Sequence, residues 1–410
     1  MNGFTTPWGE LPLTRFPEDP RDRLRAWDAA DEYLLHHLHG DHRHGDEEHG
    51  ELPGSAAPVD LAGAAVVLGD RWGSLTTALA TARTAGTASV AGGEQVLITD
   101  SFLGRQATAA NLARAGFAPD AVRLLSTADA PPERIDLLLV RVPKSLALLE
   151  DQLHRLAPAI HPGTVVIGTG MVTEIHTSTL RLFERILGPT RTSLARRKAR
   201  LIFCVPDPAL AATRPASPWP LRYALPDDLG VLAGRTVTNH AGVFCAEHLD
   251  IGTRFFLQHL PHRQGPDRVV DLGCGNGVLG TAAALANPRA ELTFIDESFP
   301  ALASAEATFR ANAGPDAPAE FLAGDALDAV GAGSVDLVLS NPPFHSHQAT
   351  TDATAWRMFT GARRALRPGG ELWIVGNRHL GYHLKLRRLF GRCELVAGNP
   401  KFVVLRAVRQ

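Results

Sequence analysis

Cysteine is scarce in this sequence, and its four cysteines, Cys204, Cys245, Cys274 and Cys393, are far apart. Because no Cys-x-x-Cys pair is present, neither a disulfide framework nor a thiolate zinc site is indicated. The chain also lacks any run of ~18 apolar residues, and its amino terminus lacks a basic-then-apolar pattern. We therefore expect a cytoplasmic protein with no membrane span, no secretory signal and no bound metal.

Net charge is small as well, −2 over 410 residues. The chain therefore lacks the strong overall positive charge that would indicate nucleic-acid binding. The charge is nevertheless unevenly distributed. Residues 1–60 carry 13 acids against five Lys and Arg, whereas residues 357–409 carry 12 Lys and Arg against two acids. Five more basic residues and no acid lie from Arg191 to Arg200. Such asymmetry suits a polyanionic partner, although solvated surface helices would explain either basic region alone.

Histidine is concentrated near the amino terminus, where six residues lie between His36 and His49. Neutral imidazole is a good metal ligand, but the interleaved glycines and acids are more typical of a polar loop. We interpret residues 1–60 as an acidic, His-rich extension with one helix near Asp22–Leu38. Any metal held there would be adventitious.

Two α/β domains are predicted after this extension. In residues 61–205, apolar strands alternate with helical patterns, which is typical of a parallel sheet with crossover helices. The expected strands are Ala64–Leu68, Gln95–Thr99, Ile135–Val140 and Thr164–Gly168, and the expected helices are Gly104–Ala115, Leu146–Leu156 and Glu174–Leu187. Residues 206–235 contain six prolines and are interpreted as a linker. Residues 236–410 form the second domain, with a helix near Cys245–Leu260 and a closing hairpin, Cys393–Ala397 with Lys401–Ala407.

A strand, a glycine-rich turn and a helix are predicted over Val269–Gly280. Glycine lets the backbone come close to a ligand, and the amino end of the helix opens toward it. Asp296 follows the next apolar strand, 19 residues after Gly277, where an acid can hold two ribose hydroxyls. The pattern predicts a ligand that contains a ribose.

A second motif, Ser340-Asn341-Pro342-Pro343-Phe344-His345, follows the apolar run Val335–Leu339. Two prolines end the strand and stiffen the turn, at the edge where open α/β sheets bind ligands. The Asn341 side-chain oxygen and the Pro342 carbonyl can accept both hydrogens of a planar NH2 group, while Phe344 stacks on its ring. The motif predicts methylation of a planar amine, although alone it also fits a plain Pro-Pro turn.

The first domain is predicted to be a degenerate copy of the second, because equivalent patterns recur at offsets of about 204, 200 and 206 residues. The first copy has no acid at the position of Asp271, and Arg71 and Trp72 occupy its glycine turn. The basic residues that replace the motif residues in this copy are suited to bind phosphate groups instead. The residues expected to bind RNA are Arg141, which replaces Asn341, Lys144, which replaces Phe344, and Arg196, Arg197 and Lys198. The alternative is a purely structural domain.

After about residue 60 the chain resembles the bacterial ribosomal RNA guanine-N(2)-methyltransferases, most of all the large-subunit (23S) type. The resemblance lies in the strings Val142–Glu150, Ile175–Leu180, Leu187–Thr190, Lys198–Ile202, Asn239–Phe244, Leu249–Phe256 and Asn341–His345. It implies two tandem Rossmann-like class I methyltransferase domains, the first of them degenerate. The acidic first 60 residues and the near-neutral charge do not follow the family pattern.

The resemblance also implies a cofactor, S-adenosylmethionine, and a role for each motif. Asp296 would hold the ribose and Asp325 the adenine amine, although Asp325 also fits a plain turn aspartate. The target guanine would lie on Asn341, Pro342 and Phe344. The other residues placed at the cofactor are Asp271, Gly273, Cys274, Gly275, Asn276, Gly277, Phe244 and again Asn341.

The expected partner is therefore ribosomal RNA of the large subunit, bound by a monomer. The same Asn-Pro-Pro-aromatic geometry also serves a DNA adenine amine, a protein glutamine amide or a small-molecule amine. A protein of another class, a ribosome assembly factor with this fold but no turnover, is the remaining alternative. The intact Asp271, Asp296 and Asn341 argue against it.

Overall fold

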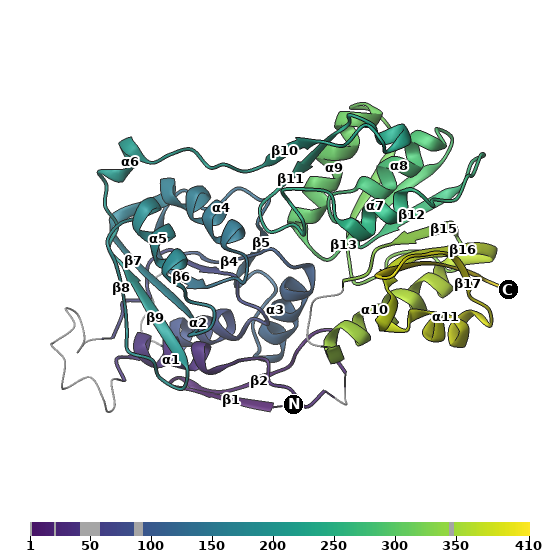
Figure 1. The fold of residues 1–410 in the computed structure, drawn as a ribbon. Helices are drawn as coiled ribbons and strands as arrows, with labels where there is room; N and C mark the ends of the chain where they lie inside the picture. The colour runs from purple at the N-terminus through teal and green to yellow at the C-terminus, as the bar shows by residue number, and fades with distance from the viewer. Residues whose placement is uncertain (1, 20–21, 42–57, 86–92, 344–347) are drawn as a thin grey trace. The chain divides into compact units, whose positions relative to one another are not determined.

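The computed structural model describes residues 2–19, 22–41, 58–85, 93–343 and 348–410, with the side chains of 348–352 left aside (Figure 1). The chain divides into two compact units, Met1–Pro218 and Trp219–Gln410, called unit 1 and unit 2 below. Each unit is built around its own seven-stranded sheet.

The sheet of unit 2 has the strand order β14-β13-β12-β15-β16-β18-β17. Five strands are parallel, and β18 and β17 join antiparallel at one side. Their bounds are β12 Arg268–Leu272, β13 Glu291–Asp296, β14 Ala319–Ala323, β15 Val335–Ser340, β16 Leu366–Asn377, β17 Glu394–Gly398 and β18 Phe402–Val408. The chain reverses its direction of winding at β12, whose two neighbours are β13 and β15.

Helices cover both faces of this sheet because successive strand residues point to opposite sides. On one face, α8 (Val278–Ala286), α9 (Phe299–Ala313) and α7 (Ile251–Leu257) pack against residues such as Leu337 and Leu339. On the other, α10 (Gln348–Ala365) and α11 (Tyr382–Phe390) cover the alternate residues, such as Val338.

Unit 1 repeats this architecture. Its strand order, β5-β4-β3-β6-β7-β9-β8, is that of unit 2 strand for strand. The strands are β3 Ala65–Leu68, β4 Gln95–Thr99, β5 Arg123–Ser126, β6 Ile135–Arg141, β7 Ile160–Met171, β8 Thr190–Thr192 and β9 Ala199–Cys204. The helices α4 (Leu146–Leu156) and α5 (Thr177–Ile186) cover one face of the sheet. On the other face lie α1 (Ala29–His39) and α2 (Ser74–Ala85), and α3 (Phe102–Arg114) packs against α2, β4 and β5.

The register of the two sheets confirms the predicted duplication. Val67 pairs with Leu139 in unit 1 as Asp271 pairs with Leu339 in unit 2, so the first acid of the motif is indeed replaced. Both sheets also have an irregularity at the same place, after Ile135 in β6 and after Val335 in β15. The predicted strands and helices of residues 61–205 are all present, whereas the helix α2, a run of alanine and threonine, and the strands β5, β8 and β9 were not predicted.

The predicted amino-terminal extension is wrong for the residues that the structure describes. A hairpin of β1 (Asn2–Thr6) and β2 (Gly9–Leu13) precedes α1, and all three belong to unit 1. The predicted helix near Asp22–Leu38 is α1. Its Leu34, Leu35 and Leu38 are fully buried in the core of unit 1, so an acidic segment still contributes an apolar face.

The predicted linker is also largely wrong. Residues 206–218 run extended apart from the short α6 (Leu210–Thr213), but the rest of the segment belongs to unit 2. There β10 (Leu221–Ala224) pairs with β11 (Thr236–Asn239), and Leu225, Leu232 and Val237 pack against α8. The prolines favour extended chain, as expected, and part of that chain pairs as a hairpin. The predicted helix near Cys245–Leu260 is the shorter α7, while the closing hairpin is confirmed as β17 and β18.

Candidate active site

The glycine turn joins β12 to α8 at the carboxyl edge of the unit 2 sheet. Gly273, Gly275 and Gly277 have positive φ angles of 68°, 53° and 74°, which side chains rarely tolerate. A Cβ atom on Gly277 would lie 2.7 Å from the Ala305 Cα of α9, so this glycine allows the helix to pack. A Cβ atom on Gly275 would meet nothing within 4 Å. The turn therefore has open space above its backbone, which a ligand could occupy.

Asp271 lies beneath the turn and is fully buried. Its Oδ2 accepts a hydrogen bond from the Gly280 backbone N–H at 2.7 Å, whereas its Oδ1 is buried and has no partner among the described residues. Burial, with a smaller contribution from the charge of nearby Asp296, raises the pKa of Asp271 to about 8, although the Gly280 hydrogen bond opposes the shift. An unpartnered buried acceptor is costly, so this oxygen suits a ligand that donates a hydrogen bond.

Asp296 ends β13, next to the turn. Its Oδ2 accepts from the Gly275 N–H at 3.0 Å and its Oδ1 from the Ser298 N–H at 2.9 Å. Burial raises its pKa, and these backbone bonds act in the opposite direction. Each oxygen keeps a further lone pair. The carboxylate is thus fixed against the turn while it can still accept two hydroxyl groups.

Asp325 follows β14, one strand further along the same edge. Burial raises its pKa, and Arg357 of α10 opposes that shift from 3.3 Å, measured from Nε to Oδ1. Arg357 already contacts one oxygen of Asp325, so an adenine amine that donates to this carboxylate would lie next to the guanidinium. Sequence reasoning did not find Arg357, because nothing in the sequence of α10 indicates a partner 32 residues earlier.

Asn341 follows β15, which pairs with β12, so it lies at the same edge. Its Nδ2 donates to the Asp250 Oδ2 at 3.1 Å and to the Thr253 Oγ1 at 3.0 Å. Its Oδ1 is buried and has no partner among the described residues. Pro342 is buried, and Phe344 lies outside the described residues. The structure therefore leaves one side-chain acceptor available at this point of the edge.

The remaining predicted cofactor residues lie on or near the turn. Asn276 donates from Nδ2 to the Asn239 Oδ1 at 3.0 Å, which ties the turn to β11. Cys274 is buried, and burial raises its pKa well above the ordinary value, so the thiol stays protonated. Phe244 lies in the loop between β11 and α7 and is 54% exposed.

These side chains converge because the carboxyl ends of parallel strands meet at one edge of a sheet. Asp271, Asp296, Asp325 and Asn341 come from four adjacent strands, at the point where the winding reverses, and doubly wound sheets bind ligands there. The orphaned Oδ1 of Asp271, the carboxylates of Asp296 and Asp325 and the open glycine turn fit S-adenosylmethionine, which brings an ammonium group, ribose hydroxyls and an adenine amine.

Comparisons with known proteins decide the family. Residues 1–208 match the model of the RLMG N-terminal domain, and residues 234–406 match that of the methyltransferase small domain. A relative from Streptomyces avermitilis, named ribosomal RNA large subunit methyltransferase G, is 68% identical over 407 residues, 99% of each chain. The chain belongs to the ribosomal RNA large subunit methyltransferase G family. Its members include a Pseudomonas aeruginosa protein that is 47% identical over 98% of this chain and 99% of its own.

The match to the RLMG N-terminal domain begins at residue 1, so the expectation that the first 60 residues depart from the family was wrong. The fold of the whole chain also resembles a solved T. thermophilus 16S rRNA N2 methyltransferase, RsmC, in complex with AdoMet and guanosine. That likeness has a TM-score of 0.69, covers 100% of this chain and 98% of the other, and shows 21% sequence identity. It confirms two tandem class I methyltransferase folds.

In unit 1 the equivalent edge is occupied by the chain's own side chains. Arg141 ends β6, where unit 2 has Asn341, and is 1% exposed. Its guanidinium contacts Asp28 at 2.6 Å, Glu174 at 2.8 Å and Asp31 at 3.4 Å. Burial by itself would lower the pKa of Arg141, but these three carboxylates raise it above its ordinary value. Its assignment to RNA phosphate was wrong, because the guanidinium is buried and already paired.

The glycine turn of unit 1 is occupied as well. Asp70 is buried in the turn and accepts from the backbone N–H groups of Gly73, at 3.1 Å, and Thr76, at 2.8 Å. Arg71 pairs with Glu174 at 2.6 Å. The side chains of Asp70 and Arg71 are thus held within unit 1, at the turn that corresponds to the glycine turn of unit 2.

The other predicted RNA-binding residues are exposed. Lys144 precedes α4, and Arg196, Arg197 and Lys198 lie at the tip of the loop between β8 and β9. Arg197 pairs with Glu32 of α1 at 2.9 Å, with the arginine side chain 76% exposed. The Arg196 guanidinium lies 5.9 Å from the Tyr33 ring centroid, also on α1. The tip is thus basic and oriented by α1.

Part of the carboxy-terminal basic charge is neutralised within unit 2. Arg357, Arg367 and Arg406 pair with carboxylates, and others donate to backbone carbonyls. On and after α11, the exposed Arg387, Arg388 and Arg392 form no ion pair with any carboxylate that the structure describes. Arg388 lies 5.5 Å from the Trp356 ring centroid of α10, so this helix face combines positive charge with an aromatic ring.

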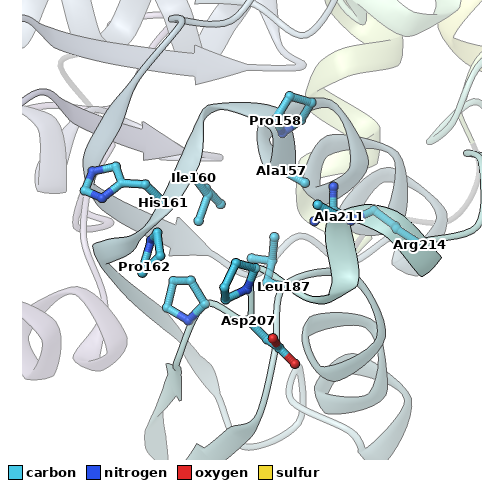
Figure 2. A pocket seen from close by; sticks show the side chains of 11 residues that line it. Ala157, Pro158, Ile160, His161, Pro162, Leu187, Asp207, Ala211 and Arg214 are labelled. Atoms are coloured by element: carbon cyan, nitrogen blue, oxygen red, sulfur yellow. The ribbon is translucent and has the colours of Figure 1, made fainter.

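A pocket of about 290 Å³ lies elsewhere, within unit 1 (Figure 2). Its wall is mostly Ala, Pro and Leu, and it lies at Ile160, the amino end of β7, opposite the ligand edge. It is therefore not the equivalent of the unit 2 site. No described helix is long and apolar enough to cross a membrane. The described residues also contain no cluster of three His, Cys, Asp or Glu suited to a metal, and half of the six histidines lie outside them.

Proposed function

We propose that this protein transfers a methyl group from S-adenosylmethionine to the exocyclic N2 amine of a guanine in large-subunit ribosomal RNA. The observation that carries the proposal is the buried, unpartnered Oδ1 of Asn341, which lies at the same edge as the glycine turn. Family membership supports RNA as the substrate, and the relatives named above bear the large-subunit name.

The side chains at the edge divide the binding task. Asp271 Oδ1 and the turn would face the methionine part, Asp296 the ribose hydroxyls, and Asp325 the adenine amine. S-adenosylmethionine, when bound, supplies an electrophilic sulfonium methyl group. The Asn341 Oδ1 and the Pro342 carbonyl would accept the two amine hydrogens and turn the nitrogen lone pair toward that methyl group.

Positioning of this kind can supply about 7–11 kcal/mol of a reaction barrier. No strong base is needed if the proton leaves after methyl transfer, because a methylated amine carrying positive charge is a strong acid. Buried Cys274 is a poor base, since its thiol stays protonated. The target base must be unpaired or flipped out of its stack, at a cost of a few kcal/mol.

RNA binding would rest on surfaces that carry unneutralised charge. In unit 1 these are Lys144 and the basic tip, Arg196, Arg197 and Lys198, of which Arg197 is paired with Glu32. In unit 2 the face of α11 with Arg387 and Arg388 offers similar donors. Such residues fix the position of a nucleic acid through its phosphates without reading sequence. We infer that unit 1 binds RNA and no cofactor, because its own side chains fill the ligand edge.

The test is Asn341→Ala. We expect methyl transfer to ribosomal RNA to fall at least a hundredfold while cofactor affinity, titrated by calorimetry, stays within threefold, because the amide faces the amine and the turn faces the cofactor. Loss of cofactor binding in a folded variant would contradict this division of roles. Mass mapping of ribosomal RNA from a strain without the gene would identify the nucleotide. If all guanines there remain normally methylated, the proposed substrate is wrong.

A further inference from the structure

We propose that Asp250 and Thr253 are positioning residues, which turn the Asn341 amide so that only its oxygen faces the substrate. The inference rests on the proposed function. It concerns two residues that contact the site through the Asn341 amide and that lie 91 and 88 residues before Asn341.

The hydrogen bonds leave the amide a single orientation. Both hydrogens of the Asn341 Nδ2 are used, one on the Asp250 Oδ2 at 3.1 Å and one on the Thr253 Oγ1 at 3.0 Å. A carboxylate can only accept. The Thr253 hydroxyl donates to the same Asp250 Oδ2 at 3.2 Å, so it also meets Asn341 as an acceptor. A flipped amide would place oxygen against two acceptors, which is unfavourable.

The fixed amide selects among substrates. A free asparagine side chain offers both a donor and an acceptor, but here the donor end is consumed and the acceptor end is buried without a described partner. A substrate group that donates an N–H can form a hydrogen bond with this oxygen, whereas a group that only accepts leaves the oxygen without a partner. The orientation therefore favours an exocyclic amine over a carbonyl oxygen at the same position of a base.

The support for this orientation is rigid. Asp250 is the N-cap residue of α7 and accepts from the Thr253 backbone N–H at 2.8 Å. Phe256 of α7 is fully buried against the sheet. A Cβ atom on Gly252 would lie 3.1 Å from the Phe402 ring, so the first turn of α7 packs closely on β18. The two acceptors are thus held by the core of unit 2.

The duplicated unit provides an internal comparison. There α1 packs on β7 and β9 as α7 packs on β16 and β18, and its N-cap residue is Asp28. Asp28 and Asp31, three residues apart as Asp250 and Thr253 are, contact Arg141, the residue that replaces Asn341. In unit 1, where the strand ends in the Arg141 cation, both helix residues are acids. In unit 2, where the strand is followed by the Asn341 amide, the helix residues are an acid and a hydroxyl, which accept the two N–H groups of that amide.

The experiment separates positioning from helix capping. Asp250→Ser keeps an N-cap side chain but is too short to reach Asn341, and Thr253→Val keeps the shape but removes the hydroxyl. Thr253→Ser, which retains the hydroxyl, is the matched control. Full-length proteins are compared in kcat and KM for ribosomal RNA, cofactor Kd and Tm.

We expect Asp250→Ser and Thr253→Val to lower kcat ten- to a hundredfold, with KM and cofactor Kd within threefold of the parent, and Thr253→Ser to stay within threefold in kcat. Parental kcat in both folded variants, beside an inactive Asn341→Ala, overturns the positioning role. If Asp250→Ser does not fold, Thr253→Val against Thr253→Ser decides alone. A parent protein that transfers no methyl group to ribosomal RNA refutes the proposed function instead.

Discussion

Asp271 and Asp296 belong to adjacent strands, yet their hydrogen bonds suit them to different tasks. Asp296 has both oxygens tied to backbone N–H groups, whereas Asp271 keeps one oxygen without a described partner. Asp296 can hold neutral hydroxyls at a fixed distance. Asp271 suits a positively charged donor, whose binding would stabilise the carboxylate form of this residue.

We expect Asp296→Ala to weaken cofactor binding by about 1.5–3 kcal/mol, the scale of hydrogen bonds to a charged group. Calorimetric titration measures the change. Asp316→Ala, at an exposed aspartate after α9, serves as the control and should bind normally. An unchanged Kd in folded Asp296→Ala removes this residue from the site.

Asp271 should also make unit 2 sensitive to pH. The ordinary pKa of 3.8 is raised to about 8 in the folded chain, mainly by burial. Between these values the folded state holds a proton that the unfolded chain releases, so stability falls as pH rises from about 4 to about 8. Asp271→Asn lacks this titration.

Between pH 5 and pH 8, the parent should therefore lose at least about 1.4 kcal/mol more stability than Asp271→Asn, the equivalent of one pKa unit. Scanning calorimetry measures this in the transition that S-adenosylhomocysteine shifts. Equal losses in both proteins would show that Asp271 is ionised in the folded state. The variant should bind cofactor more weakly.

The sequence predicts Asp271, Asp296 and Asn341 because each follows an apolar strand at a recognisable local signal. It does not predict what faces them. The contacts of Asp250 and Thr253 with Asn341 depend on how α7 packs, and the N-cap pattern Asp-x-x-Thr indicates only a helix start. Arg141 was misjudged for the same reason, since its three carboxylates come from α1 and from the loop after β7.

Among the elements, α1 differs most from expectation. Its sequence is acidic at the start and rich in histidine, which suggested an extension, yet Leu34, Leu35 and Leu38 form one buried face. Its N-cap and first turn supply Asp28 and Asp31, and Arg141 contacts both. Burial raises the pKa of Asp31 to about 7, although Arg141 opposes the shift, while Arg141 outweighs burial and lowers that of Glu174 to about 2.

We therefore expect Arg141→Met to destabilise unit 1 by about 3–5 kcal/mol, because it leaves the buried Asp31 without its cation. Urea unfolding measures the loss. Arg185→Met, which removes an exposed partner of Glu150, is the matched control and should cost about 0–1 kcal/mol. Cofactor affinity should remain unchanged in both variants. A loss in Arg141→Met no larger than the control would contradict the structural role of the network.

At the scale of the whole molecule, overall charge is a poor guide to the partner. A net charge of −2 conceals ion pairs that neutralise many basic residues and a basic tip that stays exposed. The duplication and the sheet order could be predicted, because strand patterns recur at a nearly constant offset. The unit boundaries could not, since prolines and acids mark extended or polar chain whether or not it joins a core.

Changing Arg196, Arg197 and Lys198 together to Glu should raise KM for ribosomal RNA tenfold or more and reduce the slope of log affinity against log salt by about one per lost phosphate contact. Cofactor Kd should stay unchanged. The control is a second triple variant, in which three exposed arginines of unit 2 are changed to Glu: Arg235, Arg268 and Arg289. It alters the net charge by the same amount. The same KM and salt slope in both triple variants would rule out a specific role for the tip.

The paired carboxylates around Arg141 make the replacement of asparagine by arginine at this edge of unit 1 hard to reverse. Restoring the asparagine alone would leave the buried Asp31 without its cation and Arg71 to balance both Asp28 and Glu174, and removing the acids alone would leave a buried cation without partners. Each single step back passes through a less stable protein. Arg141 and its carboxylates are therefore expected to change only together in evolution, while the exposed surface of unit 1 can vary one residue at a time.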